Sequence, residues 1–163
     1  MHAEEFKTKV LPLSGSLYRF AKSFLGSAQE AEDCVQDILL KLWTRRESIA
    51  SVRNIRAFAM QMTRNLCLDK LKSDRYKMVE IGSDIIEPNR SPYQQVEIRD
   101  TISVVEKIIR ILPEAQRTII HLRNVEELEI TEIEEVTGMT AEHIRVTLSR
   151  ARIEIRQQYQ KYL

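Results

Sequence analysis

Apolar residues recur along this chain at the three- and four-residue spacing of amphipathic α-helices, and no strand-like alternation extends beyond a few residues. Gly26 follows the first stripe as a helix C-terminal glycine would, and Ser27 begins a capping-box spacing with Glu30. Asn54 is a suitable N-cap for a third helix. The three predicted stripes are Leu17, Phe20, Ala21 and Phe24; Ala31, Cys34, Val35, Ile38 and Leu42, closed by Trp43; and Ile55, Phe58, Ala59, Met62 and Leu66.

Two segments lack this periodicity. The polar stretch from Thr44 to Arg53 is predicted to be a loop, and the stretch from Met78 to Asp100, which contains glycine and proline, is predicted to be a linker. Pro113 fits the first position of a later helix. The second half carries Ile102, Val105, Ile108, Ile109 and Leu112, then Ile119, Ile120 and Leu122.

The pattern therefore predicts an all-α protein with two small helical domains joined by a flexible linker. Three helices are expected in the first domain and four or more in the second. The predicted boundaries are residues 1–77 for the first domain, 78–101 for the linker and 102–163 for the second domain.

Charge reverses sharply near the C-terminus, although the formal net charge of the whole chain is only +1. Asn124–Val136 carries six acidic residues and no basic residue, whereas Thr140–Leu163 carries five Lys or Arg against two Glu. Gly138 lies between the two segments. An acidic helix, a glycine-containing turn and a basic helix have the outline of a helix-turn-helix in the second domain. The spacing from Thr131 to Glu134 predicts a capping box at the start of the acidic helix.

The basic helix is predicted to bury one face and to present the opposite face to a polyanion. Ile144, Leu148, Ala151 and Ile155 share the core face at 100° per residue. An opposite face with arginine and a small apolar residue suits the DNA major groove, where arginine pairs with guanine and valine contacts a thymine methyl group. A solvated basic face is the alternative interpretation. The candidate DNA-contacting residues are Arg145, Val146, Ser149 and Arg150 for bases, and Arg152 and Arg156 for phosphates.

Composition narrows the class of protein. The chain has 163 residues, of which 43% are hydrophobic and 30% charged, as in soluble globular proteins. Cys34 and Cys67 match no metal-ligand or redox spacing and lie in apolar helical patterns, so we expect buried thiols. No apolar run has the length of a membrane span, and no secretory leader begins the sequence, so we expect a cytoplasmic protein.

Two separated stretches resemble the extracytoplasmic-function (ECF) group of bacterial RNA polymerase sigma subunits. The segment Ala31–Trp43, AEDCVQDILLKLW, resembles that family's polymerase-binding helix. Asn54–Phe58 and Arg64–Asp69 follow at the usual distance and resemble the helix that holds the promoter −10 element. The remaining matches, which resemble the domain that binds the −35 element, are Leu112–Arg117, Glu132 with Ile133, and Leu148–Arg152.

This resemblance implies a task for each part of the chain. The side of the second helix with Asp33, Asp37 and Lys41 would dock on core RNA polymerase, through its β′ and β subunits, with an ordinary solvated face as the alternative. The loop from Thr44 to Asn54 would capture an unstacked −10 base. Residues implied in −10 binding are Asn54, Arg56, Arg64, Asn65 and Lys70, with Lys72 as a further backbone contact.

The resemblance also implies partners. These are core polymerase, promoter DNA and an anti-sigma factor that would cover the −10 helix, the recognition helix or both, and no cofactor, metal or small-molecule substrate is expected. Only Phe58 is aromatic between Thr44 and Asn65, whereas housekeeping sigma factors carry several aromatics there, so promoter opening would depend on loop capture. The family usually has glycine near Glu127 and alanine at Glu134.

Two other classes of function are alternatives to a promoter-specificity subunit that catalyses nothing. The first is a stand-alone DNA-binding regulator that uses only the C-terminal helix-turn-helix. The second is a helical-bundle enzyme with a carboxylate metal site, suggested by Glu30, Glu32, Asp33 and Asp37. Such bundles need Glu-x-x-His pairs, and neither His121 nor His143 has glutamate three residues before it. The sequence therefore predicts a non-enzymatic protein.

Overall fold

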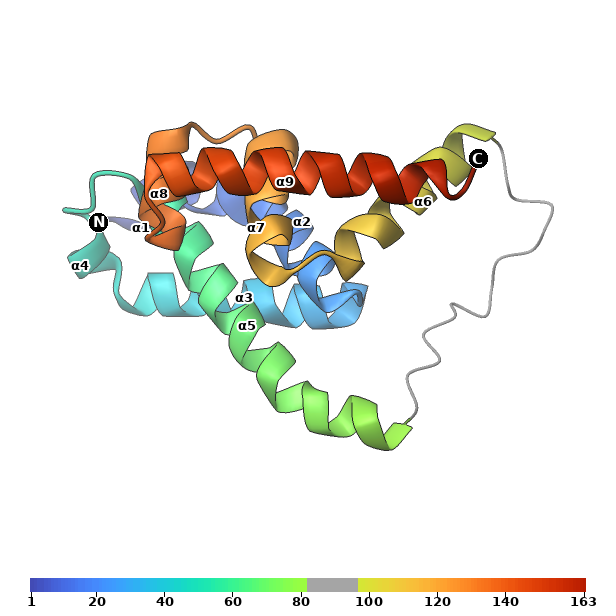
Figure 1. The fold of residues 1–163 in the computed structure, drawn as a ribbon. Helices are drawn as coiled ribbons and strands as arrows, with labels where there is room; N and C mark the ends of the chain where they lie inside the picture. Colours follow the sequence, from blue (N-terminus) through green and yellow to red (C-terminus); the bar gives the residue numbers. More distant parts are fainter. Residues whose placement is uncertain (82–96) are drawn as a thin grey trace.

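The computed structural model describes residues 1–81 and 97–163, with side chains described for residues 1–73 and 101–163. The helices are α1 (Ala3–Lys9), α2 (Ser14–Leu25), α3 (Ala28–Thr44), α4 (Arg46–Ile49), α5 (Ile55–Ile81), α6 (Glu97–Ile111), α7 (Glu114–Ile120), α8 (Ile130–Thr137) and α9 (Ala141–Gln160). A 3₁₀ turn (Leu11–Leu13) follows α1, and a π-helical turn (His121–Val125) extends α7. All regular structure in the described residues is helical, as predicted (Figure 1).

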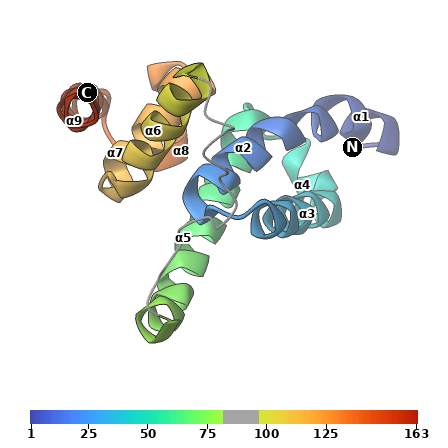
Figure 2. The ribbon, with the colours of Figure 1, turned by 90° about the vertical axis from the view of Figure 1, so that its right-hand side faces the viewer.

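The helices form an N-terminal cluster, α1 to α5, and a C-terminal cluster, α6 to α9 (Figure 2). In the N-terminal cluster α2 packs against α3, and α5 packs against both. Gly26 ends α2 in the left-handed conformation, with φ of 73°, and the Ser27 side chain accepts a hydrogen bond from the Glu30 amide, 3.3 Å away. Both predicted helix boundaries are confirmed, and the predicted stripes of α2 and α3 are buried apart from the closing Trp43, which is 36% exposed.

The segment from Thr44 to Arg53 is not entirely a loop, because α4 forms within it and buries Ile49. A buried apolar residue accounts for this one-turn helix, since isolated helices of four residues are not stable. Helix α1 at the start of the chain also goes beyond the three predicted helices, and Phe6 of α1 packs edge-on against Trp43, with 5.0 Å between ring centroids.

Helix α5 buries a different set of residues from the predicted stripe. Asn54 caps it as predicted, accepting a hydrogen bond from the Ala57 amide at 3.0 Å. Ala59 alone of the predicted stripe is fully buried, and its other members are partly buried. Among the α5 residues up to 73, whose side chains are described, the fully buried ones are Ala57, Ala59, Met60, Thr63 and Cys67. The reason is that α5 contacts α2 and α3 on one side and α8 on another, so that apolar and small residues are covered around much of its circumference.

The C-terminal cluster is built on contacts of α9 with α6, α7 and α8. Its core contains residues from each helix and from the π-helical turn: Ile108, Leu112, Ile119, Ile120, Leu122, Leu128, Ile133, Val136, Ile144, Leu148 and Ala151. Helix α7 begins at Glu114, one residue later than predicted, so Pro113 is its N-cap rather than its first helical residue. Ile102 of the predicted stripe is 55% exposed.

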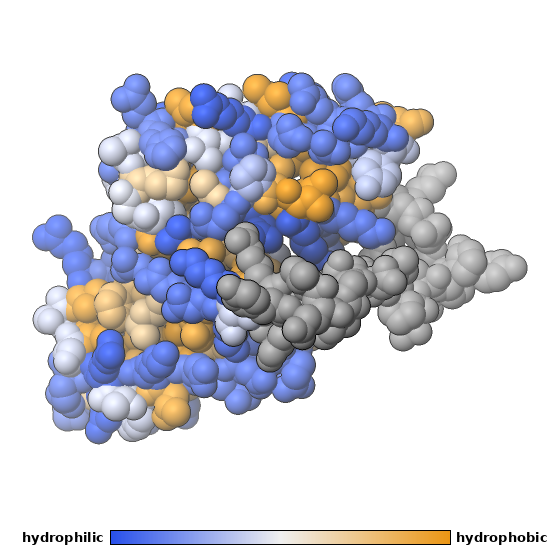
Figure 3. All heavy atoms as spheres, turned by 60° about the horizontal axis from the view of Figure 1, so that its bottom comes forward, coloured by the Kyte–Doolittle hydropathy of each residue, from blue (hydrophilic) through white to orange (hydrophobic). Residues whose placement is uncertain are grey.

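The two clusters lie against each other, with α5 and α2 facing α8, α6 and the π-helical turn. On the face drawn in Figure 3, hydrophilic residues cover most of both clusters and apolar residues form smaller patches among them. Most of the predicted linker falls outside the described residues. At its margins α5 continues to Ile81 and α6 begins at Glu97, so helix extends into the predicted linker from both sides.

Candidate nucleic-acid interface

The basic helix α9 divides into a core face and an exposed face, as its sequence predicts. Thr140 caps it, accepting a hydrogen bond from the His143 amide at 3.2 Å. Ile144, Leu148 and Ala151 are buried, and Ile155 is partly buried against the same core. The opposite face is exposed throughout: Glu142, Arg145, Val146, Ser149, Arg150, Arg152, Ile153 and Arg156.

The turn before α9 has the geometry of a helix-turn-helix. Gly138 ends α8 with φ of 74°, where a Cβ would be strained, and its amide donates to the Glu134 carbonyl at 2.8 Å. The predicted capping box at Thr131 is wrong. Glu129 is the N-cap, and Glu132 accepts from its amide at 3.1 Å, because α8 begins one residue before Thr131. Helices α8 and α9 still pack together, with Ile133 and Val136 buried.

The residues predicted to read the −35 element thus share one accessible surface. Arg145, Val146, Ser149 and Arg150 are exposed on the N-terminal half of α9, and Val146 is 41% exposed despite its apolar side chain. Arg152 differs from these four because its Nη2 donates to Asn124 Oδ1 at 3.1 Å, which ties it to the end of the π-helical turn.

The residues predicted to bind polymerase lie on the exposed face of α3. Asp33, Asp37 and Lys41 are all exposed, and Gln29 donates to Asp33 at 3.2 Å. Leu40 lies on the same face at helical spacing and is 64% exposed, which sequence reasoning missed. The available signal was its position outside the buried stripe of α3, where an apolar residue has no core to join.

Beside this face, Trp43 is partly covered by the Arg46 guanidinium, which lies 4.2 Å from the ring centroid. Trp43 is nevertheless 36% exposed at the end of α3. Together with Leu40 it makes this end of the helix both apolar and charged, which is the usual composition of a protein-binding surface.

Three of the five residues predicted to bind the −10 element face the C-terminal cluster. Asn54 Nδ2 donates to Glu132 Oε2 at 3.2 Å. Arg56 Nη2 donates to the backbone carbonyl of Glu126 at 2.6 Å. Arg64 Nη2 forms an ion pair with Glu114 Oε1 at 3.1 Å.

The other two predicted −10 residues differ from these three, because Asn65 is exposed and Lys70 is partly buried. The structure therefore brings Asn54, Arg56 and Arg64 to one side of α5, and it pairs each of them with a residue of the C-terminal cluster.

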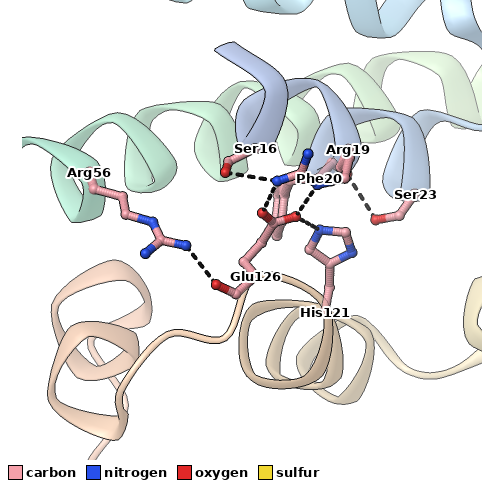
Figure 4. A network of polar contacts seen from close by, with 7 residues as sticks. All are labelled: Ser16, Arg19, Phe20, Ser23, Arg56, His121 and Glu126. Carbon is pink, nitrogen blue, oxygen red and sulfur yellow. Dashed lines mark hydrogen bonds and ion pairs between the residues drawn. The ribbon is translucent and has the colours of Figure 1, made fainter. Parts of the chain in front are cut away.

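Glu126 is the centre of a polar network between the clusters (Figure 4). Its side chain is fully buried, and it accepts hydrogen bonds from Arg19 Nη2 at 2.8 Å and Arg19 Nε at 3.1 Å. His121 Nε2 lies 3.0 Å from Glu126 Oε2, the carboxylate oxygen that also accepts from Arg19 Nε. Burial raises the pKa of the Glu126 carboxyl, but the hydrogen bonds from His121 and Arg19 outweigh burial, so the pKa falls to about 2 from an ordinary value of 4.5. The hydrogen bond to Glu126 raises the pKa of Arg19.

Aromatic contacts extend this network along α2. Phe20 packs edge-on against the His121 imidazole, with 5.3 Å between centroids, and the Arg117 guanidinium lies 4.3 Å from the centroid of the Phe24 ring. Burial lowers the pKa of the Arg117 guanidinium from its usual range. Sequence reasoning missed Arg19, His121 and Glu126, because no local pattern connects positions so far apart in the chain.

The two thiols are buried, as predicted. Cys34 of α3 and Cys67 of α5 have their sulfur atoms 3.9 Å apart in the core of the N-terminal cluster. Residues 1–81 and 97–163 contain no group of three or more His, Cys, Asp and Glu side chains positioned to hold a metal ion. No helix in the described part of the chain combines the length and apolar character that a membrane crossing requires.

Comparison with known proteins assigns both clusters. The sigma-70 region 2 family model matches residues 11–76, and the sigma-70 region 4 family model matches residues 103–155. The ECF RNA polymerase sigma factor SigW of Bacillus subtilis is 24% identical over 153 residues, which cover 87% of this chain and 82% of SigW. SigL of Mycobacterium tuberculosis is 38% identical over 68 residues, covering 41% of this chain and 38% of SigL.

The fold has a solved counterpart. The Bartonella quintana sigma factor RpoE, in complex with the anti-sigma factor NepR, superposes with a TM-score of 0.77 at 24% identity, over 97% of this chain and 98% of that one. With a region 2 match followed by a region 4 match, this chain belongs to the sigma-70 family and to its ECF group. It is a sigma factor, which directs RNA polymerase to promoters and catalyses no reaction itself.

Proposed function

We propose that three surfaces divide promoter recognition among them: the exposed face of α3 binds core polymerase, the α5 surface binds the −10 element, and the exposed face of α9 binds the −35 element. The observation that carries this assignment is the exposure of the α3 and α9 residues opposite buried stripes. The domain boundaries at residues 77 and 102 follow the same division.

On α3, Asp33 and Asp37 supply negative charge for basic side chains of the polymerase, and Leu40 supplies apolar contact area. Charged pairs at such a surface steer association and fix register, whereas the buried apolar anchor supplies affinity. Lys41 extends the same face by one helical turn. The docking site is therefore a mixed surface rather than a purely acidic one.

On α9, Arg145, Val146, Ser149 and Arg150 occupy the N-terminal half, which is the part of a recognition helix that reaches base edges. Arg152 donates to Asn124, which fits a phosphate-facing or positioning role better than base reading.

The α5 surface would hold the −10 strand through its backbone and through a captured base. Its proposed contact residues are Asn54, Arg56, Arg64, Asn65 and Lys70.

An anti-sigma factor is a further expected partner, and the protein would act in the cytoplasm with the polymerase. The exposed apolar residues Leu40 and Trp43 on α3 and Val146 and Ile153 on α9 are suitable contacts for such a partner. The anti-sigma complex of the Bartonella quintana counterpart supports this proposal by analogy.

Co-purification with core RNA polymerase tests the docking surface. Wild-type protein is expected to bind in stoichiometric amounts, and an Asp33→Arg/Asp37→Arg variant is expected to lose binding because it places positive charge opposite positive charge. A Glu5→Arg/Glu135→Arg variant is the matched control, since it changes net charge equally at exposed positions outside α3. Equal binding by all three proteins would remove α3 from the docking surface.

A further inference from the structure

A cavity of about 340 Å³ lies where α2, α6 and the π-helical turn meet. Each of the three elements contributes lining residues: Tyr18 and Lys22 of α2, Ile109 and Arg110 of α6, and Val125 of the turn. Residues from two distant parts of the chain therefore border one space. Its volume is at the lower end of the range for small-molecule sites, so it suits a ligand smaller than most drug molecules.

Apolar side chains form part of the lining of this cavity. Tyr18 and Ile109 are partly buried and pack against the hydrophobic core, whereas Val125 is 46% exposed. An apolar ligand that covered these three side chains would remove their remaining apolar surface from water, which is the main source of affinity at most small-molecule sites. The cavity therefore favours a ligand with a hydrophobic body.

Two cations at the cavity are available to an anion. The side chains of Lys22 and Arg110 form no hydrogen bond or ion pair with another described side chain. The Arg110 guanidinium carbon lies 3.9 Å from the position that a Cβ on Gly26 would take, so it reaches from α6 to the end of α2. Among the described lining residues Glu106 is the only acidic one, and it is exposed. The excess of positive charge attracts an anion to this space.

The Glu126 network fixes the polar wall of the cavity. Arg19 and His121 both line the cavity and both contact Glu126 (Figure 4), which balances the charge of Arg19. Because an ionised carboxylate only accepts hydrogen bonds, His121 Nε2 donates to it. The other ring nitrogen, Nδ1, makes no hydrogen bond to the described residues, although the side chain is only 5% exposed. A buried imidazole with one nitrogen unused can orient a ligand.

We propose that this cavity binds a small hydrophobic organic anion, such as an aromatic carboxylate. The apolar body of the ligand lies against Tyr18, Ile109 and Val125, and its charged group lies between Lys22 and Arg110. An inorganic anion would leave the apolar side chains uncovered, and a neutral molecule would leave both cations without a partner. This inference goes beyond promoter recognition, and it does not depend on which residues contact DNA or polymerase.

The position of the cavity makes it a regulatory site. The contacts to the ligand come from α2 of the N-terminal cluster and from α6 and the π-helical turn of the C-terminal cluster, so the full site exists only where these elements meet. A ligand that binds only the assembled site stabilises that assembly by mass action. A small organic acid would in this way change how firmly the two clusters of the sigma factor are held together.

Titration of the full chain with cinnamate, followed by the backbone amide shifts of the ¹⁵N-labelled protein, tests the site. Cinnamate combines an aromatic body with a carboxylate, and cinnamyl alcohol is the neutral probe of nearly the same shape. A Lys22→Gln/Arg110→Gln variant removes the two proposed contacts of the charged group. The matched control, Lys7→Gln/Lys107→Gln, removes the same charge at exposed positions outside the lining, one in each cluster. The amide spectra also report whether each variant is folded.

Wild type and control are expected to bind cinnamate with a dissociation constant on the order of 1 mM or tighter, with shifts in α2, α6 and the π-helical turn. Cinnamyl alcohol on wild type, and cinnamate on the Lys22→Gln/Arg110→Gln variant, should each bind at least about tenfold more weakly. Equal binding of acid and alcohol would overturn the preference for an anion, and unchanged binding by that variant would overturn the roles of the two cations. The absence of saturable shifts at these three elements, or shifts centred on Leu40 and Trp43 instead, would overturn the site itself.

Discussion

Arg19 and Glu126 lie 107 residues apart in the sequence, and two hydrogen bonds of 2.8 and 3.1 Å join the guanidinium of one to the carboxylate of the other. The carboxylate is fully buried, whereas the Arg19 side chain is 53% exposed. The pair is therefore asymmetric: the arginine remains in contact with water, whereas the buried glutamate depends on its hydrogen-bond partners.

Acid should weaken the folded protein through Glu126. Its pKa is about 2 in the folded protein against an ordinary 4.5, so its contribution is complete above about pH 4.5 and is lost as the pH falls towards about 2. A shift of this size corresponds to on the order of 3 kcal/mol. Urea unfolding at constant ionic strength should show wild type losing more stability than Glu126→Gln between about pH 5 and pH 3.

The Glu135→Gln variant is the control for this comparison, because Glu135 is exposed, and its loss of stability should follow that of wild type. Parallel curves for wild type and Glu126→Gln would show that the buried carboxylate has no special share in acid sensitivity. Other carboxylates titrate in the same range, and for that reason the difference between the proteins is the informative quantity.

Two substitutions of Asn54 distinguish its role as the N-cap of α5 from its contact with the C-terminal cluster. Its Oδ1 accepts from the Ala57 amide while its Nδ2 donates to Glu132. Asp is an equally good N-cap, so Asn54→Asp should preserve α5 but place two carboxylates against each other and expand the protein. Asn54→Ala loses both contacts and should lower the free energy of unfolding by about 1 kcal/mol.

Thermal unfolding and small-angle scattering on the two Asn54 variants distinguish these effects. The expected result is a stable, expanded Asn54→Asp protein and a destabilised Asn54→Ala protein. An Asn54→Asp protein as compact as wild type would mean that the Glu132 contact adds nothing to the packing of the two clusters against each other.

The sequence predicted the elements whose core lies within one cluster, and it failed where the two clusters meet. The stripes of α3 and α9 are correct because each helix buries one face against its own cluster. The stripe of α5 is largely wrong because α8, from the other half of the chain, covers a further side of it. Hydrophobic periodicity describes burial on a single face, and a helix shared by two clusters has no single buried face.

The same limit explains the missed site residues. Six acidic residues between Asn124 and Val136 predict an acidic helix, yet Glu126 lies before α8 and is buried, and Glu132 faces α5. What makes that burial possible is Arg19, for which local sequence provides no signal. By contrast, the exposed face of α9 could be predicted residue by residue, because it depends only on helical geometry and on the stripe opposite.

Glu127 has φ of 56°, the one non-glycine residue in the left-handed region within the described part of the chain. A left-handed conformation costs a residue with a Cβ about 1–2 kcal/mol, and glycine avoids most of that cost. Glycine also loses more entropy on folding, by roughly 0.5–1 kcal/mol, so Glu127→Gly should stabilise the protein by about 0.5 kcal/mol. Urea unfolding measures this change.

A β-branched residue at the same position should have the opposite effect. Glu127→Val should destabilise by more than about 1 kcal/mol, because branching at Cβ makes the left-handed region still less accessible. Glu127→Ala controls for the lost charge and should lie between the two. If Gly, Ala and Val gave the same stability, the turn before α8 would carry no backbone strain.

Arg150 and Arg152 lie two residues apart on α9, but we expect them to contact different parts of the promoter DNA. Arg150 is exposed on the outer face, where a bidentate contact with guanine is possible, so Arg150→Ala should cost about 1–3 kcal/mol and relax choice at one base pair. Arg152 is held by Asn124, and Arg152→Ala should weaken all promoters to a similar extent. Transcription by reconstituted holoenzyme on a promoter library randomised across the −35 element measures both effects.

The library separates base reading from phosphate binding because only the former changes the rank order of sequences. For Arg150→Ala we expect one position to lose its preference while the others keep theirs. A uniform loss across the library would make Arg150 a phosphate contact, and base reading would then rest on Arg145, Val146 and Ser149 nearer the start of α9. A changed rank order in Arg152→Ala would instead mean that Asn124 orients Arg152 towards a base, which would extend the reading surface along α9.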